Sequence, residues 1–178
     1  MIDAPLPSDG RSNPALTEGV HARMSNDRIL QTARVVLRIA MGSAFLYSTA
    51  DRLGLLGPYG SRNVSWGDWR HFQEYVAILN WYIPKALIPA LSTLETIIEA
   101  GLGLWLLLGL YLRIVAWSSA ILLSSFALTM AIALGIGAPL GYGVFTAIGA
   151  AFMLGAIAVP NRMTASEPAS IVRSLAHP

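Results

Sequence analysis

Long apolar stretches, interrupted by charge at only a few points, dominate the chain from residue 29 to residue 160. Residues 114–161 form a run of 48 residues without a charged side chain. As one helix this run would be about 72 Å long, more than twice the hydrocarbon thickness of a bilayer. Gly135 and Pro139 mark the break, since Gly ends helices and Pro begins them. The pattern therefore predicts four spans, at 29–50, 86–110, 113–135 and 140–160.

These spans are expected to be helices. Backbone polar groups must be satisfied inside a membrane, which leaves helices or a closed barrel, and apolar runs this long exceed a barrel strand. The composition agrees, because 54% of residues are hydrophobic and 12% charged, whereas soluble domains carry about 25% charged residues. We expect an all-α membrane protein with a four-helix bundle at 29–160, a flexible cytoplasmic tail at 1–28 and a second tail at 161–178. Nucleic-acid binding is excluded.

Basic residues are unevenly divided between the two predicted sides. One side carries eight: Arg11, Arg23, Arg28, Arg34, Arg38, Arg113, Arg162 and Arg173. The other carries four: Arg52, Arg62, Arg70 and Lys85. Since the richer side is cytoplasmic in such proteins, both termini are expected in the cytoplasm of a bacterial-type inner membrane.

The outer connection at 51–85 is rich in aromatic residues. Trp69, Phe72, Val76 and Leu79 fall on one helical arc, so a short helix lying in the membrane interface is predicted. Its aromatic side chains form an interfacial belt or a lid over a ligand site.

Two carboxylates interrupt the second span near its middle. Glu95 and Glu99 are four residues apart and share one helix face with Ser92 and Gly103. A carboxylate at that depth is costly unless it is paired, protonated or hydrated. This face must therefore lie against protein or a water-filled crevice.

The first span carries a matching face with two arginines. Arg38, Thr49 and Arg52 lie in nearly the same direction along a helix. If the two spans are antiparallel neighbours with aligned midpoints, Arg38 lies within about 10 Å of Glu99 along the axis, and Arg52 equally near Glu95. Two ion pairs are predicted. They fix the helix register, form a functional polar site or provide an assembly surface for another subunit.

Other chemistry is limited by the residue inventory. The sequence contains no cysteine, which excludes a thiol nucleophile or a disulfide relay within it. His71 is expected at the surface, and a metal site there would have to recruit Asp68 and Glu74.

The polar positions resemble those of the DoxX family of small four-helix membrane proteins. The likeness rests on five segments: Arg38 to Phe45, Arg52 to Gly54, Trp66 to Trp69, Glu99 to Arg113 and Phe126 to Met130. It implies a four-helix bundle, and relatives in that family include the membrane subunit of a thiosulfate:quinone oxidoreductase and a partner of oxidative-stress proteins. Thr49 and Arg52 depart from the Gly and Lys usual there. A lysine-dependent proton step is therefore not expected, because Arg holds its proton.

Residues and resemblance together predict a membrane subunit of a quinone-linked or oxidative-stress redox complex. Glu95 and Glu99 would exchange the proton of quinone reduction. The residues expected to line the polar site or cover its outer mouth are Arg38, Arg52, Thr49, Ser92, Gly103, Trp66, Trp69 and Trp81. No covalent cofactor is expected, and electrons would come from a redox partner, so the chain is at most an oxidoreductase subunit. Contact with the lipid bilayer and a homo-oligomer fit this prediction. The alternative is a non-catalytic scaffold or a small-solute carrier.

Overall fold

The computed structural model describes residues 14–158, with side chains from residue 23 onward. All regular structure in this range is helical. The elements are α1 (Pro14–Arg52), α2 (Trp69–Leu79), the 3-10 turn η1 (Lys85–Leu87), α3 (Ile88–Leu108), α4 (Leu112–Leu134), α5 (Gly137–Gly141) and α6 (Val144–Ile157). The all-helical prediction is confirmed over this range. The predicted tail at 161–178 and residues 1–13 lie outside the described residues.

Three helices are long and apolar enough to cross a membrane. They correspond to Arg23–Arg52, Lys85–Leu108 and Leu112–Leu134, while α6 is apolar but shorter, with 14 residues. Large side chains on their outer faces are exposed, among them Ile97, Ile121 and Ile132. Such a continuous exposed apolar surface fits lipid rather than water. The chain is a multi-pass membrane protein.

Two helix boundaries differ from those predicted. Helix α1 begins at Pro14, so residues 14–28 are helical and not a flexible tail. Pro is favourable in the first turn, and the Ala, Leu, Met and Arg residues that follow are good helix formers. After the predicted break at Gly135, the chain makes the short α5 before α6 starts, because Gly143 adopts a positive φ of 67°.

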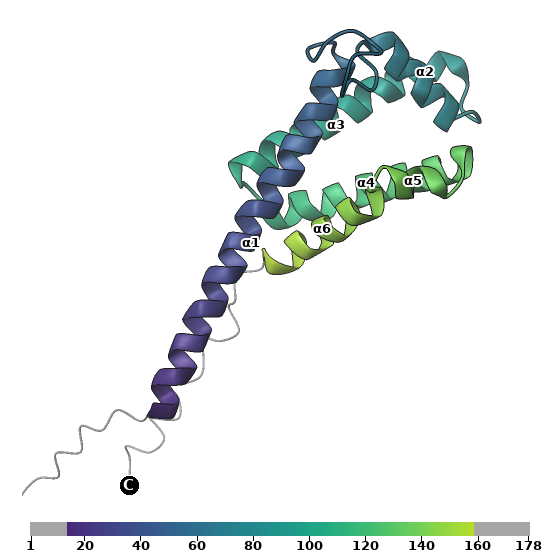
Figure 1. The fold of residues 1–178 in the computed structure, drawn as a ribbon. Coiled ribbons are helices and arrows are strands. Elements are labelled where there is room, and N and C mark those ends of the chain that lie inside the picture. The colour runs from purple at the N-terminus through teal and green to yellow at the C-terminus, as the bar shows by residue number, and fades with distance from the viewer. Residues whose placement is uncertain (1–13, 159–178) are drawn as a thin grey trace, which may run out of the picture.

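The helices form two arms that meet at one end. Helix α1 packs mainly against α3, and α4 against α6, and the two arms diverge toward α2 (Figure 1). We call the end that holds Arg52, α2 and η1 the α2 end, and the end that holds the α3–α4 turn and the C-terminus of α6 the turn end. The N-terminal part of α1 continues beyond the turn end (Figure 1).

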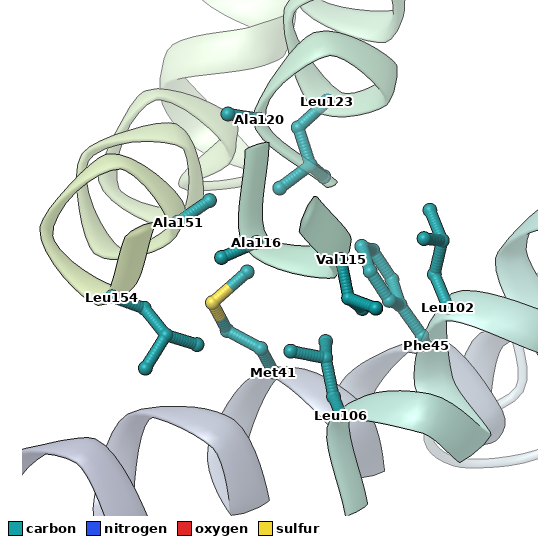
Figure 2. Packing of buried hydrophobic residues seen from close by; sticks show 10 residues of the cluster. All are labelled: Met41, Phe45, Leu102, Leu106, Val115, Ala116, Ala120, Leu123, Ala151 and Leu154. Atoms are coloured by element: carbon teal, nitrogen blue, oxygen red, sulfur yellow. The ribbon is translucent and has the colours of Figure 1, made fainter. Parts of the chain in front are cut away.

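A shared hydrophobic core joins the arms toward the turn end. Figure 2 shows its members: Met41, Phe45, Leu102, Leu106, Val115, Ala116, Ala120, Leu123, Ala151 and Leu154. The alanines let α4 and α6 approach closely, as small residues do between membrane helices. Helices α1, α3, α4 and α6 all contribute, so this core fixes how the arms meet.

A glycine pair sets the approach of α1 and α3. A Cβ atom at Gly42 would lie 2.9 Å from the carbonyl oxygen of Gly103, and one at Gly103 would lie 3.1 Å from the carbonyl oxygen of Gly42. Backbone therefore meets backbone at this point, which only glycine permits. The contact fixes the antiparallel register of the two helices.

Two arginines of α1 bind the ends of other helices. Arg38 Nη2 donates to the Leu107 carbonyl at 3.2 Å, and Arg34 Nε donates to the Ile157 carbonyl at 2.5 Å. Both carbonyls belong to last helical turns, which lack intrahelical donors and carry the negative end of the helix dipole. The predicted ion pair between Arg38 and Glu99 is wrong, because Arg38 lies at the end of α3, about two turns beyond Glu99.

The glycine contact can be tested with alanine substitutions. Gly42→Ala and Gly103→Ala should each destabilise the protein by about 1–3 kcal/mol, because the added methyl group meets backbone that cannot yield. Gly149→Ala on α6 is the matched control, since nothing lies within 4 Å of its Cβ position. The measurement is the thermal unfolding midpoint of the purified protein in detergent. Equal midpoints for all three variants would refute the close approach.

Candidate functional site

A fully buried ion pair joins α1 to α3 near the α2 end. Arg52 Nη2 lies 2.6 Å from Glu99 Oε2, and the two side chains are 2% and 4% exposed. The guanidinium also donates to Thr96 Oγ1 at 3.1 Å, to Ser48 Oγ at 2.8 Å and to the Ser48 carbonyl at 3.3 Å. Nearly all its donors are therefore satisfied, as a buried charge requires.

Two aromatic rings cover the guanidinium. Its Cζ atom lies 4.0 Å from the centroid of the Phe72 ring and 5.3 Å from that of the Trp66 ring. Both distances suit cation–π attraction, which is strengthened by the exclusion of water. Helix α2 supplies Phe72, and the loop before it supplies Trp66. The loop and α2 thus shield the ion pair from solvent on that side.

Glu95 is not part of this ion pair. The predicted pair of Glu95 with Arg52 is wrong, because Arg52 reaches one turn further along α3, to Glu99. Among the described residues Glu95 makes no salt bridge. Its half-buried side chain instead lines a cleft.

This cleft lies between the two arms. It has a volume of about 810 Å³ and is walled by α1, α2, α3, α4 and α6. Its lining residues with a carboxylate, guanidinium or imidazole group all come from α1, α2 and α3: Arg52, His71, Glu74, Glu95 and Glu99. The wall from α4 and α6 is apolar except for Thr146 and the nearby Tyr142. The size is that of a typical ligand site.

Asp51 holds the loop that carries Trp66, a role the sequence analysis missed. Its carboxylate is 1% exposed and accepts hydrogen bonds from the backbone N–H groups of Ser65 at 2.7 Å, Trp66 at 3.3 Å and Gly67 at 2.9 Å. A buried carboxylate needs such donors. An acid directly after the first span was the available signal, but its partners are backbone groups, which sequence does not identify.

A polar cluster borders the cleft at the α2 end. Asp68 caps α2 by accepting from the backbone N–H of His71 at 2.9 Å, and this bond holds the pKa of Asp68 below its usual value of 3.8. The His71 ring stacks on Tyr59 with centroids 4.0 Å apart, and Arg70 pairs with Glu74 at 2.9 Å. In residues 23–158, no three His, Asp or Glu side chains are grouped to hold a metal.

The structure gathers some predicted site residues and separates others. Arg52, Glu95, Glu99 and Trp66 line the cleft. The other predicted residues do not line it. On the helices, Arg38 binds the end of α3, Gly103 makes the contact with α1, Ser92 donates to the Ile88 carbonyl, and Thr49 is buried. Of the two remaining tryptophans, Trp69 packs on Phe72 and Trp81 is 70% exposed. Tyr75 and Phe126 line the cleft but were not predicted.

These features define a class, an all-helical membrane protein with a polar site between its helices. A family model described as methylamine utilisation protein MauE matches residues 30–141, more than half of the chain. The chain belongs to the MauE family. Comparisons with curated proteins and with solved structures found no match.

The predicted membership of the DoxX family is wrong, since the matching family is MauE. Several residues that suggested DoxX have packing roles in this structure. Gly42 and Gly103 bring two helices together, Gly109 ends α3, and Arg38 binds the end of that helix. Such a pattern is required by close helix packing and does not identify one family.

Removing the guanidinium tests the buried ion pair. Arg52→Met should destabilise the protein by about 3–5 kcal/mol, because Glu99 stays buried without its partner. The control is Glu95→Gln, which lies on α3 like Glu99 but outside the ion pair, and it should change the unfolding midpoint little. The double variant Arg52→Met/Glu99→Leu should recover much of the stability that Arg52→Met loses, because no unpaired charge remains buried. An Arg52→Met protein as stable as the wild type would contradict the assignment.

The loop attachment can be tested by proteolysis. Asp51→Ala should weaken the closed loop by roughly 1–3 kcal/mol, because three backbone N–H groups lose a charged acceptor. Tryptic cleavage after the exposed Arg62 should accelerate while the helical content is kept. Asp27→Ala, an exposed site on the same helix, is the control. Unchanged cleavage in Asp51→Ala would count against the attachment.

Proposed function

We propose that this chain is the membrane-embedded, ligand-binding subunit of a methylamine-utilisation system, with the cleft as its working site. The family description supports the system. One observation supports this site above all. The wall of a cleft of about 810 Å³ contains both the Arg52–Glu99 ion pair and a further carboxylate, Glu95, which lies outside that ion pair. Intramembrane ionisable residues of this kind mark functional sites by default.

The cleft suits an amphipathic ligand. Its polar wall is formed by α1, α2 and α3, and its opposite wall by apolar side chains such as Leu123, Phe126 and Met130. A head group that accepts or donates hydrogen bonds fits the polar wall, while an apolar chain fits the other wall and the lipid beyond it. An isoprenoid quinone combines both parts.

In a quinone site of this kind, Arg52 and Glu95 would have different roles. Arg52 is held by Glu99, Thr96 and Ser48, so it keeps the polar wall in place. Within residues 23–158 Glu95 has no ion-pair partner, and it is the group that can give or take a proton. Reduction of a quinone to a quinol takes two electrons and two protons, and the electrons come from a partner redox protein.

The proposal includes a membrane topology. Helices α1, α3 and α4 cross the bilayer, and α5 with α6 makes a fourth, shorter crossing, about 21 Å for the 14 residues of α6 alone. Helix α2 lies at the outer interface, and the turn end faces the cytoplasm in accord with its excess of arginine. The cleft then opens at the outer side.

The ligand can be identified by native mass spectrometry of the protein purified in mild detergent. We expect a bound isoprenoid quinone in the wild type and about tenfold weaker retention in Glu95→Gln, because a hydrogen bond to a charged group contributes about 1.5–3 kcal/mol. Thr93→Ala, an exposed site on α3 away from the cleft, should retain the quinone. A wild type without quinone, or equal retention in Glu95→Gln, would favour a scaffold or a small-solute carrier.

A further inference from the structure

The cleft reaches the surface at the α2 end through polar and charged residues. Tyr59, His71 and Glu74 line it there, and Tyr59 is 60% exposed. The side chain of Glu74 is 56% exposed, and its partner Arg70 is 71% exposed. Because charged side chains prefer contact with water, we expect water in the outer part of the cleft.

Toward the turn end the same cleft is closed by packed side chains. Leu106, Ala116 and Leu154 are completely buried in the shared core, and Met41 and Phe45 separate the cleft from them. The Gly42–Gly103 contact leaves no space between α1 and α3, and the Leu107 carbonyl beyond it is bound by Arg38. A path for water through this plug would have to cross close-packed apolar side chains.

Glu95 lies on the open side of this plug. It is seven residues from the start of α3 at the α2 end, about 10 Å along the helix, and one turn nearer that end than Glu99. The charged groups and the imidazole that share the cleft with it are Arg52 from α1, His71 and Glu74 from α2, and Glu99 from its own helix. The ionisable tyrosines of the lining are Tyr59 from the outer loop, Tyr75 from α2 and Tyr142 at the end of α5. Helices α4 and α6 contribute none to the lining.

We infer that Glu95 exchanges water and protons with one side of the membrane only, the side on which α2 lies. The carboxylate is reached through the rim formed by Tyr59, His71 and Glu74 and is sealed from the turn end by the core. In combination with the proposed function, on which this last step rests, a ligand reduced or oxidised in the cleft exchanges its protons on the α2 side alone.

The absence of cysteine from the sequence allows a direct test with single-cysteine variants. Glu95→Cys is treated with a membrane-impermeant sulfonated methanethiosulfonate reagent, in vesicles of either orientation. Leu55→Cys and Tyr111→Cys, 74% and 75% exposed, mark the α2 side and the turn-end side. Leu94→Cys is the depth control, because it neighbours Glu95 but is 56% exposed away from the cleft.

We expect Glu95→Cys to be labelled from the side that labels Leu55→Cys. From the side that labels Tyr111→Cys it should not be labelled. Leu94→Cys should react from neither side. Ala147→Cys, which lines the cleft from α6 and leaves both glutamates in place, should repeat the one-sided pattern. This second variant decides the result if Glu95→Cys does not fold.

Labelling of both cleft variants from the turn-end side, from both sides or from neither would overturn the inference. The outcome does not depend on the ligand, because the thiol reports only water access. One-sided labelling together with an absence of quinone in mass spectrometry would keep the inference and remove the proposed ligand. Two-sided labelling with bound quinone would do the reverse.

Discussion

The buried pair of Arg52 and Glu99 is the constraint on which the α2 end of this molecule depends. Two charges removed from water repay their desolvation only when their geometry is good and their remaining hydrogen-bonding groups are satisfied. The surroundings meet this requirement. Ser48 and Thr96 accept from the guanidinium, and Phe72 covers its face. The outer loop and α2 therefore have a structural reason to fold over the first span.

A second buried carboxylate holds that cover in place. Asp51 is adjacent to Arg52 in sequence, yet it points to the loop and binds three consecutive backbone N–H groups. In the last turn of α1, Asp51 thus points toward the outer loop, and the next residue, Arg52, points into the helix bundle. Trp66 and Phe72, held in this way, form one border of the cleft.

The sequence predicts the long helices, but the predicted register of α1 against α3 is wrong by about one helical turn. The predicted midpoints set residue 42 opposite residue 99, whereas the observed contact sets Gly42 opposite Gly103. That shift of four residues is about 6 Å. It takes Arg38 past Glu99 to the end of α3. Arg52 becomes level with residue 93, and its side chain reaches Glu99 because it extends back along α1, where its Nε donates to the Ser48 carbonyl. Apolar periodicity locates spans and faces, but register depends on which small residues touch, and two glycines in a span of several are not distinguishable in advance.

Local signals in the sequence predict structure more accurately. The arc of Trp69, Phe72, Val76 and Leu79 predicted a helix, and α2 spans Trp69–Leu79 with Asp68 as its cap. The sequence could not separate Trp66, which lines the cleft, from Trp81, which is exposed, because both are aromatic residues of one loop region. Only the attachment of residues 65–67 to Asp51 distinguishes the two tryptophans. That attachment consists of hydrogen bonds from backbone N–H groups to a carboxylate about fifteen residues earlier in the sequence, and backbone donors cannot be identified from residue types.

The two arms also have different parts in the cleft, and this follows from how they are joined. The ion pair, Glu95 and the cover belong to α1, α2 and α3, while α4 and α6 present mainly apolar side chains. The arms share their core toward the turn end, where Arg34 ties α1 to the last turn of α6. Because the charged groups are fixed on one arm, that arm would position the head group of the proposed ligand. The family match at residues 30–141 contains this entire arm from Leu30 onward and ends before α6, so every charged residue of the cleft lies within the part of the chain that defines the family.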